Sequence, residues 1–454
     1  MSIMSDTFYA LATPPGTSAL AVIRVSGPDV PRLVFEIFRR KLEAANDRRA
    51  MVGYYRSLRD ERVDQVVYTY FPATSSYTGR ELLEISSHGN MFLVEQILED
   101  LGSRGCRLAE PGEFTRTAFL EGRMDLSQAE AVADLIAARS AAALESAHRQ
   151  LAGGLGEEIE RRVEEVLAIR AHLEAYIDFP EEDIPNEDQE GPIASIQETV
   201  SRLDRMIATG RQRELLHRGI RTVILGAVNA GKSSLLNRLL GEERAIVSDT
   251  AGTTRDYIQD VLQLGAFGIQ LFDTAGFREA SDVIEVEGLR KTEKIVGTAD
   301  FFLLVVDGAL PSPALPDELL GRLEPENSLV VFNKCDDPGF VMNDSFLPGI
   351  PRIALSARTG EGVEEFLALW ESRFQSELLE GAESRVLYNQ RHIGHLRECR
   401  DSLLRARDGL RAGVSTEYVA PDLRDALDSL GAVVGNVDNE AMLDVLFGDF
   451  CIGK

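Results

Sequence analysis

Cysteine is scarce in this chain and follows no ligand or cross-linking pattern. The 454 residues include four cysteines, with neither C-x-x-C nor Cys/His metal spacing. A zinc site and a disulfide framework are both disfavoured, and we expect reduced thiols. The four are Cys106, Cys335, Cys399 and Cys451. We interpret the first three as packing residues.

Long apolar runs are also missing. No stretch approaches the ~20 residues of a membrane span, and the N-terminus lacks a basic-then-apolar signal pattern. We therefore expect a cytoplasmic protein that does not associate with a membrane.

Basic residues are too few to balance the acidic ones. There are 48 Lys and Arg against 74 Asp and Glu, a formal net charge of −26 at pH 7. This balance disfavours a broad electrostatic footprint for nucleic acid, but it is compatible with a local basic patch or with a partner that holds the nucleic acid. The content of 44% hydrophobic and 27% charged residues is typical of a globular protein. A chain of this length favours about three domains.

Composition and periodicity divide the chain into regions. Residues 1–118 combine strand-like runs with a helical pattern, which indicates a mixed α/β domain. Residues 119–213 are almost wholly helical, and residues 219–378 alternate strand and helix as in a parallel-sheet domain. Helical patterns return over residues 379–454. We predict a helical domain made from two segments, with the α/β domain inserted between them.

The same patterns predict individual elements. Strands are predicted over 20–25, 63–71, 82–86 and 221–225, and helices over 91–101, 127–151, 155–177, 388–412 and 420–447. Residues 178–192 are acidic and punctuated by proline, which is typical of a solvated loop. A carboxylate metal cluster is the alternative interpretation of that loop.

The motif GAVNAGKSSLLN, residues 226–237, matches G-x-x-x-x-G-K-[ST]. It lies between an apolar run and a helical pattern, and so predicts a strand–loop–helix unit that cradles phosphate. Lys232 would reach the outer phosphates, and the Ser233 hydroxyl would ligate Mg2+. An ordinary glycine turn before a helix is the alternative. The candidate nucleotide-binding residues here are Asn229, Ala230, Gly231, Lys232, Ser233 and Ser234.

Four further motifs follow in the order expected of a GTPase. SDTAGTTRD would supply a switch threonine, Thr254, to the magnesium shell, and DTAG a carboxylate and a glycine N–H near the terminal phosphate. NKCD would place Asp336 against the guanine N1–H and exocyclic amine, and SAR the Ala357 N–H against the guanine carbonyl. Five motifs in this order predict a guanine-nucleotide site. The additional candidates are Ser248, Asp249, Thr250, Ala251, Gly252, Thr253, Thr254, Asp273, Thr274, Ala275, Gly276, Asn333, Lys334, Asp336, Ser356, Ala357 and Arg358.

Phe277 follows DTAG, where many GTPases carry a glutamine that orients the attacking water. A phenyl ring can neither orient water nor accept a proton. The nearest ionisable candidates are Glu279, Asp282, Glu285 and Glu287, and the residues alone favour none of them.

Further stretches accompany the GTPase motifs. They are SYTGRELLEISSHG (76–89), PGEFTRTAFLEGRMDLSQAEAVADLI (111–136), IDFPEEDI (177–184), AGTTRD, DTAGFREASD and the terminal CIGK. With these stretches the chain resembles, over essentially its whole length, the MnmE (also called TrmE) family of tRNA modification GTPases. The resemblance implies a multidomain α/β plus all-α fold, with a folate-binding N-terminal domain, a discontinuous helical domain and an inserted Ras-like P-loop GTPase domain.

The resemblance also implies partners and cofactors. We expect a homodimer that joins the flavoprotein MnmG in a heterotetramer or larger complex and acts on tRNA. Together the two proteins would add an aminomethyl or carboxymethylaminomethyl group to carbon five of the wobble uridine. The implied ligands are GTP/GDP, Mg2+, K+ and a tetrahydrofolate derivative (5-formyl- or methylene-tetrahydrofolate), while FAD and NADH come through the partner.

Position within the family motifs assigns roles to single residues. Glu285 matches the catalytic, water-orienting glutamate, and Cys451 matches a residue of tRNA modification rather than of GTP hydrolysis. A small buried apolar side chain is the alternative for Cys451. The implied K+ ligands are Asn229, Ser248, Thr250 and Thr253. The implied folate contacts are Arg24, Glu84, Arg123 and Lys454, for which ordinary surface charges are the alternative.

The chain departs from the family pattern at several positions. Ala227-Val228 replace a usual Arg-Pro, HGN at 88–90 replaces HGG, and Arg123 replaces a lysine of different hydrogen-bond geometry.

A function of another class is the alternative to a tRNA modification GTPase. It is a non-catalytic guanine-nucleotide switch, such as a ribosome-assembly factor.

Overall fold

The computed structural model describes residues 6–42, 48–178, 190–241, 245–246, 261–273, 297–375, 387–435, 440–448, 450 and 452–453. The chain divides into two compact units, each assembled from separated stretches. Unit 1 comprises Met1–Ala133, Gln150–Pro192 and Asp408–Lys454. Unit 2 comprises Asp134–Arg149 and Ile193–Arg407.

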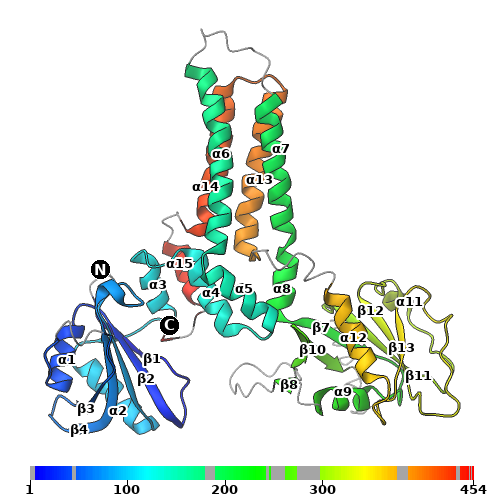
Figure 1. Ribbon diagram of the computed structural model, residues 1–454, viewed down its shortest axis with the longest axis horizontal. Helices are drawn as coiled ribbons and strands as arrows, with labels where there is room; N and C mark the ends of the chain where they lie inside the picture. Colours follow the sequence, from blue (N-terminus) through cyan, green and yellow to red (C-terminus); the bar gives the residue numbers. More distant parts are fainter. Residues whose placement is uncertain are drawn as a thin grey trace, which may run out of the picture. The chain divides into compact units, whose positions relative to one another are not determined.

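Unit 1 contains a six-stranded sheet with the order β3-β4-β5-β2-β1-β6 (Figure 1). All neighbouring strands pair antiparallel except β1 and β6. Helices α1 (Val30–Phe38) and α2 (Met91–Ser103) cover one face of the sheet and bury its inward side chains with their own. The strands are β1 (Phe8–Leu11), β2 (Ser18–Ser26), β3 (Met51–Arg56), β4 (Arg62–Phe71), β5 (Leu82–Gly89) and β6 (Arg107–Leu108), and a 3-10 turn spans Ala73–Ser75.

Two pairs of helices also belong to unit 1. The long helix α6 (Gly154–Asp178) packs along α14 (Thr416–Val434), and α15 (Glu440–Gly448) packs against α3 (Glu113–Leu120) (Figure 1). The C-terminal residues return to the N-terminal sheet. At Gly453, with φ 96°, a Cβ would lie 2.5 Å from the Leu11 carbonyl oxygen, so only glycine allows this approach.

Unit 2 is built around β7 (Ile220–Leu225), the centre of a seven-stranded sheet with the order β13-β12-β11-β7-β10-β9-β8. Strands β13 to β10 in this order are parallel, while β9 pairs antiparallel with both β10 and β8. Strand β11 reads FFLLVVD because both faces of a parallel sheet are covered. The other strands are β8 (Ala245–Ile246), β9 (Val261–Leu264), β10 (Phe267–Asp273), β11 (Phe301–Asp307), β12 (Ser328–Asn333) and β13 (Arg352–Ala354).

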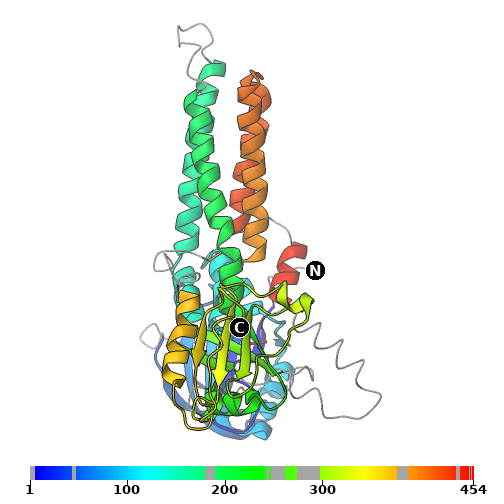
Figure 2. The ribbon, with the colours of Figure 1, turned by 90° about the vertical axis from the view of Figure 1, so that its right-hand side faces the viewer.

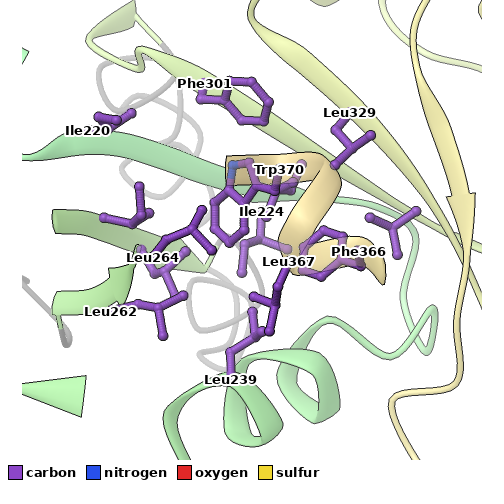
Figure 3. Packing of buried hydrophobic residues seen from close by; sticks show 14 of the residues in the cluster. Ile220, Ile224, Leu239, Leu262, Leu264, Phe301, Leu329, Phe366, Leu367 and Trp370 are labelled. Atoms are coloured by element: carbon purple, nitrogen blue, oxygen red, sulfur yellow. The ribbon is translucent and has the colours of Figure 1, made fainter. Parts of the chain in front are cut away.

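One face of this sheet packs against helices α9 (Lys232–Gly241) and α12 (Val363–Phe374). Figure 3 shows Trp370 and Phe366 of α12 beside Ile224 of the central strand, with Leu239 of α9 below them. Trp370 and Phe366 are fully buried. A close-packed core of this kind holds the strands rigidly and therefore fixes the loops at their carboxyl ends.

The remaining helices of unit 2 are α5 (Ala141–Leu151), α7 (Glu190–Ala208), α8 (Gly210–Arg218), α11 (Asp317–Leu320) and α13 (Gln390–Arg411). Helices α7 and α13 lie side by side in both views (Figures 1 and 2). Arg407 of α13 donates to Gln197 Oε1 of α7 at 2.6 Å. None of the described helices combines the length and the apolar character needed to cross a membrane.

Two predicted helices are interrupted. The pattern over 127–151 forms α4 (Leu126–Ala137) and α5, because the Ser140 hydroxyl accepts from the Ala143 N–H at 3.1 Å and starts a new helix there. The pattern over 420–447 forms α14 and α15. Helix α14 ends at Gly435, whose φ is 95° and where a Cβ would lie 2.7 Å from Leu126 Cβ.

The predicted fold class is confirmed. A mixed α/β region comes first, helices form from two separated stretches of the chain, and a largely parallel sheet forms between those stretches.

Candidate nucleotide site

The loop after β7 lies at the carboxyl edge of the parallel sheet, where open α/β sheets bind ligands. Two of its glycines are required by their surroundings. At Gly226, with φ 152°, a Cβ would lie 2.2 Å from the Val305 carbonyl oxygen. At Gly231, with φ 94°, a Cβ would lie 2.1 Å from Asn333 Nδ2. The loop can therefore approach its neighbours only with glycine at both positions.

Lys232 is the first residue of α9 and is buried under the loop. Its Nζ donates to the carbonyl oxygens of Gly226 and Ala227, both at 2.9 Å. The ammonium group is thus held inside the curve of the loop, where the positive end of the α9 dipole also lies. A phosphate placed over the loop would meet both positive charges.

Asn229 stands at the exposed crest of the loop with φ 64°. Asparagine is one of the few residues with a side chain that adopts this left-handed conformation readily. Residues 226–229 are all exposed, which leaves the crest accessible to a ligand.

Asn333 joins the phosphate loop to the loop that follows β13. Its side chain is buried; Nδ2 donates to the Ala230 carbonyl oxygen at 2.8 Å, and Oδ1 accepts from the Ala357 N–H at 2.9 Å. The SAR motif predicts that this N–H contacts the guanine carbonyl, whereas in the structure it donates to Asn333. Both ends of the amide are satisfied, so this one side chain ties two ligand-binding loops together.

Asp336 follows β12 and faces the same loop. Arg358 donates to its Oδ2, and the Ser356 hydroxyl also donates to the carboxylate. The Ser356 hydrogen bond, followed by Arg358, lowers the pKa of Asp336. The carboxylate therefore stays ionised at neutral pH and acts only as an acceptor, as recognition of two neighbouring N–H groups requires.

Two residues of the site were missed by sequence reasoning. Asp307 ends β11 and accepts from Lys334 Nζ at 2.5 Å, which holds Lys334 in place. The sequence carries a signal for Asp307, because this carboxylate comes directly after the apolar run of β11. Arg238 of α9 donates to the carbonyl oxygens of Ala357 and Arg358, both at 2.7 Å. Nothing in the sequence distinguishes Arg238 from a surface arginine.

Part of the predicted site lies outside the described residues. At its border, Asp273 ends β10 and pairs with Ile224 of β7, so its backbone lies beside the strand that leads into the phosphate loop. The predicted site residues outside the described ranges are Ser248, Asp249, Thr250, Ala251, Gly252, Thr253, Thr254, Thr274, Ala275, Gly276, Glu285, Cys451 and Lys454.

The described residues contain no group of three or more His, Cys, Asp or Glu that could hold a metal ion. A nucleotide-bound Mg2+ needs fewer protein ligands, because phosphates and water supply most of its coordination. Ser233, exposed in the first turn of α9, fits that requirement. Its hydroxyl would hold the ion beside the phosphate loop, where Mg2+ neutralises phosphate charge.

A second predicted site lies in unit 1. Arg24 of β2 and Glu84 of β5 are directly opposite each other, and Arg24 Nε donates to Glu84 Oε1 at 2.8 Å. A second nitrogen of Arg24 donates to the Gly453 carbonyl oxygen at 3.4 Å. The structure therefore brings two of the predicted folate contacts together with the C-terminal segment.

Arg123 lies in the same unit and donates to the Ala73 carbonyl oxygen. It borders the loop that carries Tyr77. The Tyr77 hydroxyl bonds to the Thr115 hydroxyl at 3.0 Å, and burial raises the pKa of Tyr77.

Asn90 is the residue at which HGN departs from the family's HGG. Its side chain accepts from the Phe92 N–H at 3.0 Å and caps α2. The substituted residue therefore stabilises the turn that it occupies.

Family models match nearly the whole chain. The model of the GTP-binding protein TrmE N-terminus covers residues 7–123, and the model of the MnmE helical domain covers residues 126–451. The chain belongs to the MnmE family. The family resemblance seen in the motifs is thereby confirmed.

Two further members of the MnmE family match this chain over essentially their full length. The tRNA modification GTPase MnmE of Opitutus terrae is 44% identical over 458 residues, which is 100% of both chains. The protein of the same name from Akkermansia muciniphila is 42% identical over 451 residues, 99% of each chain. Among solved structures, the G domain of the T. maritima FeoB iron transporter covers 34% of this chain and 98% of its own at 24% identity. The TM-score of this match is 0.24.

Proposed function

We propose that this chain hydrolyses GTP in the course of tRNA modification. The observation that carries the proposal is the Asn333 bridge, which ties the phosphate loop to the loop beside Asp336 with hydrogen bonds of 2.8 and 2.9 Å. The loop that would bind the phosphates and the loop that would bind the base are therefore held together by one side chain. We include tRNA modification in the proposal because the relatives are named tRNA modification GTPases.

Guanine selectivity rests on Asp336. Its ionised carboxylate accepts two hydrogen bonds, and guanine offers two neighbouring donors in N1–H and the exocyclic amine. Adenine carries an unprotonated N1 at that edge and would leave the carboxylate facing an acceptor. An unpaired charge of this kind is costly, so ATP would be discriminated against.

Potassium activation and the water-orienting residue are finer parts of the proposal. The exposed side chain of Asn229 would hold K+ together with Ser248, Thr250 and Thr253, and the ion would neutralise the charge that develops on the phosphates. Phe277 cannot handle the attacking water. That step falls to Glu285.

The modification chemistry is assigned to unit 1 and a partner. The Arg24–Glu84 pair next to Gly453 supports a folate site with Arg123 and Lys454 at its border. Folate would deliver the one-carbon unit to carbon five of the wobble uridine. The flavoprotein MnmG would supply FAD and NADH chemistry, and Cys451 lies two residues before the tail position that Arg24 contacts.

The exposed face of the N-terminal sheet supports a homodimer. Leu20, Val52, Tyr54 and Val67 are exposed by 60, 66, 41 and 41%, and the strand register places them on one face. An exposed apolar patch of this kind marks an interaction surface.

The proposed location of the protein is the cytoplasm, where tRNA is found.

Steady-state turnover tests the proposal. We expect hydrolysis of GTP but not of ATP, much faster in K+ than in Na+, and lost in Glu285→Ala with nucleotide affinity retained. Nucleotide binding without turnover in either salt would instead identify a non-catalytic switch. Equal rates in both salts would refute only the potassium assignment.

A further inference from the structure

Arg238 lies in the last turn of α9, whereas Lys232 and the phosphate loop lie at the start of that helix. Its side chain is half-buried and reaches the loop after β13, more than one hundred positions further along the chain. Nε donates to the Ala357 carbonyl oxygen and Nη2 to the Arg358 carbonyl oxygen, both at 2.7 Å. One guanidinium group therefore holds two successive peptide groups.

The loop that Arg238 holds is folded around the guanidinium group. We call residues 356–360 the base loop. The Ser356 carbonyl oxygen accepts from the Gly360 N–H at 2.9 Å, and the Ser356 hydroxyl accepts from the Thr359 N–H at 3.1 Å. At Gly360, with φ 93°, a Cβ would lie 2.9 Å from Arg238 Nη1. The glycine therefore closes a tight turn and also leaves room for Arg238.

Ala357 is held at both its N–H and its carbonyl oxygen. The N–H donates to Asn333 Oδ1 at 2.9 Å, and the carbonyl oxygen accepts from Arg238. Asn333 ties the base loop to the phosphate loop, while Arg238 ties it to α9, about 9 Å along the helix axis from Lys232. A loop held only by Asn333 could pivot about that contact. The attachment to Arg238 removes this freedom.

The base loop in turn orients Asp336. The Ser356 hydroxyl donates to the Asp336 carboxylate, and Ser356 is 1% exposed, so this contact is made from inside the fold. The contact from Arg358 comes from an exposed side chain, which guanine can displace. Ser356 is joined directly to Ala357, whose backbone Arg238 fixes. A shift of the base loop would therefore move the hydroxyl and turn the carboxylate with it.

Stabilisation of α9 is the simpler explanation of Arg238, because a cation in the last turn of a helix interacts favourably with the helix dipole. A side chain directed to solvent or to the last carbonyl groups of α9 would serve that purpose. Arg238 instead donates twice to a different loop. Arg373 provides a comparison, since it lies in the last turn of α12 and donates to the Pro325 carbonyl oxygen, and neither residue belongs to the predicted site.

We infer that Arg238 is a positioning residue for guanine selectivity, which holds the base loop so that Asp336 accepts from both guanine donors. The inference rests on the proposed function, in which Asp336 recognises N1–H and the exocyclic amine. It adds a residue from outside the nucleotide-binding motifs, which acts through the base loop and not by contact with the nucleotide.

Inosine diphosphate (IDP) separates selectivity from general binding. Hypoxanthine keeps N1–H but lacks the exocyclic amine, so Asp336 accepts one hydrogen bond from it and two from guanine. The ratio of the dissociation constants of IDP and GDP therefore measures how well the carboxylate is placed for the second bond. A loss common to both nucleotides cancels in this ratio.

The test uses the full chain and the displacement of a fluorescent GDP analogue by GDP or IDP. Arg238→Met removes the donors and keeps an apolar side chain of similar length, and Arg238→Lys keeps the charge without the fork of donors. Arg373→Met is the matched control, because it removes an arginine that holds a carbonyl oxygen elsewhere in unit 2.

We expect the unmodified chain to prefer GDP to IDP by about tenfold or more. Arg238→Met should bind GDP at least about tenfold more weakly and lower the preference at least about threefold. Arg238→Lys should lower the preference at least about twofold, and Arg373→Met should leave both affinities within about twofold. In steady-state turnover, Arg238→Met should raise KM for GTP more than it lowers kcat, because the phosphate loop keeps its residues.

An unchanged preference in Arg238→Met, or an equal change in Arg373→Met, would overturn the inference and leave Arg238 as a stabilising contact. Equal affinities of the unmodified chain for GDP and IDP would also overturn it. If Arg238→Met does not fold, Arg238→Lys decides, and an unchanged preference there has the same consequence. A preference for GDP that depends on Arg238, without GTP turnover by the unmodified chain, would contradict the proposed function and support this inference.

Discussion

Arg358 donates a hydrogen bond to the carboxylate of Asp336, the group that we propose accepts from guanine. A guanidinium group presents two N–H donors side by side, and guanine presents N1–H and its exocyclic amine in a similar way. Guanine and Arg358 therefore compete for one acceptor. The Arg358 side chain is 80% exposed, so solvent screening keeps this competition weak.

Removal of Arg358 should strengthen nucleotide binding. We expect Arg358→Ala to raise GDP affinity about two- to fivefold at low salt, with the gain fading as salt screens the pair. A titration with a fluorescent GDP analogue measures this. Arg352→Ala, which removes another arginine that pairs with an exposed aspartate in unit 2, is the matched control and should change little. A loss of affinity in Arg358→Ala would mean that Arg358 contacts the nucleotide instead.

The phosphate loop should not tolerate a methyl group at Gly231. Alanine there would collide with Asn333 Nδ2 and would hold φ near 94°, which strains a residue with a side chain. We expect Gly231→Ala to lower GDP affinity by about 100-fold or more, measured by the same titration. Gly241→Ala, at the other end of α9, meets no atom within 4 Å and should bind like the unmodified chain. Similar affinities for both variants would contradict the Asn333 bridge.

Two buried thiols should be inert near neutral pH. Burial raises the pKa of Cys106 to about 11 and that of Cys399 to about 12. We expect iodoacetamide at pH 8 to leave both unmodified in the folded chain and to label all four cysteines after denaturation, as read by mass spectrometry. Rapid labelling of either residue in the folded chain would show that its thiol is accessible.

The same shifts predict a stability change at high pH. A folded pKa above the unfolded value favours the neutral thiol, so this contribution is present below the ordinary value of 9.0 and is lost as pH rises toward 12. The difference in free energy of unfolding between the unmodified chain and Cys399→Ala should therefore narrow over that range. Denaturant melts at successive pH values would measure it, and a constant difference would contradict the assignment.

Arg24 should govern folate binding without affecting GTP. Charge-assisted hydrogen bonds and the contact with Gly453 depend on it, so we expect Arg24→Ala to weaken 5-formyltetrahydrofolate binding about tenfold or more, by calorimetric titration of the full chain. Arg32→Ala removes an exposed arginine that pairs with Glu36 in the same unit and should have little effect. GTP turnover should be equal in both variants. If Arg24→Ala binds folate as tightly as the unmodified chain, Arg24 is an ordinary surface charge and not a folate contact.

Local patterns were sufficient to predict the phosphate loop. Gly226 and Gly231 are required by close approach to Val305 and Asn333, and the strand before them is long and apolar. The spacing of such residues is visible in any sequence. The same reasoning predicted one helix over 127–151 and missed the break at Ser140, because the hydrogen bonds of Ser140 at the start of α5 include one to Leu216, 76 residues away.

Contacts between distant residues account for what could not be predicted. Arg238 and Ala357 are 119 positions apart, and Arg24 and Gly453 are 429 positions apart. No periodicity connects residues at such separations, since only the folded chain brings them together. For the same reason, the use of the Ala357 N–H by Asn333 could be found only in the structure.

The most direct test of the account is a nucleoside analysis of tRNA from cells that lack this chain. We expect wobble uridines to lose the aminomethyl and carboxymethylaminomethyl groups, and the unmodified chain to restore them. Asp336→Asn, which removes the carboxylate that accepts from guanine, should fail to restore them although the protein is folded and present. Normal wobble uridines in the deleted cells, or full restoration by Asp336→Asn, would contradict a GTP-dependent role in tRNA modification.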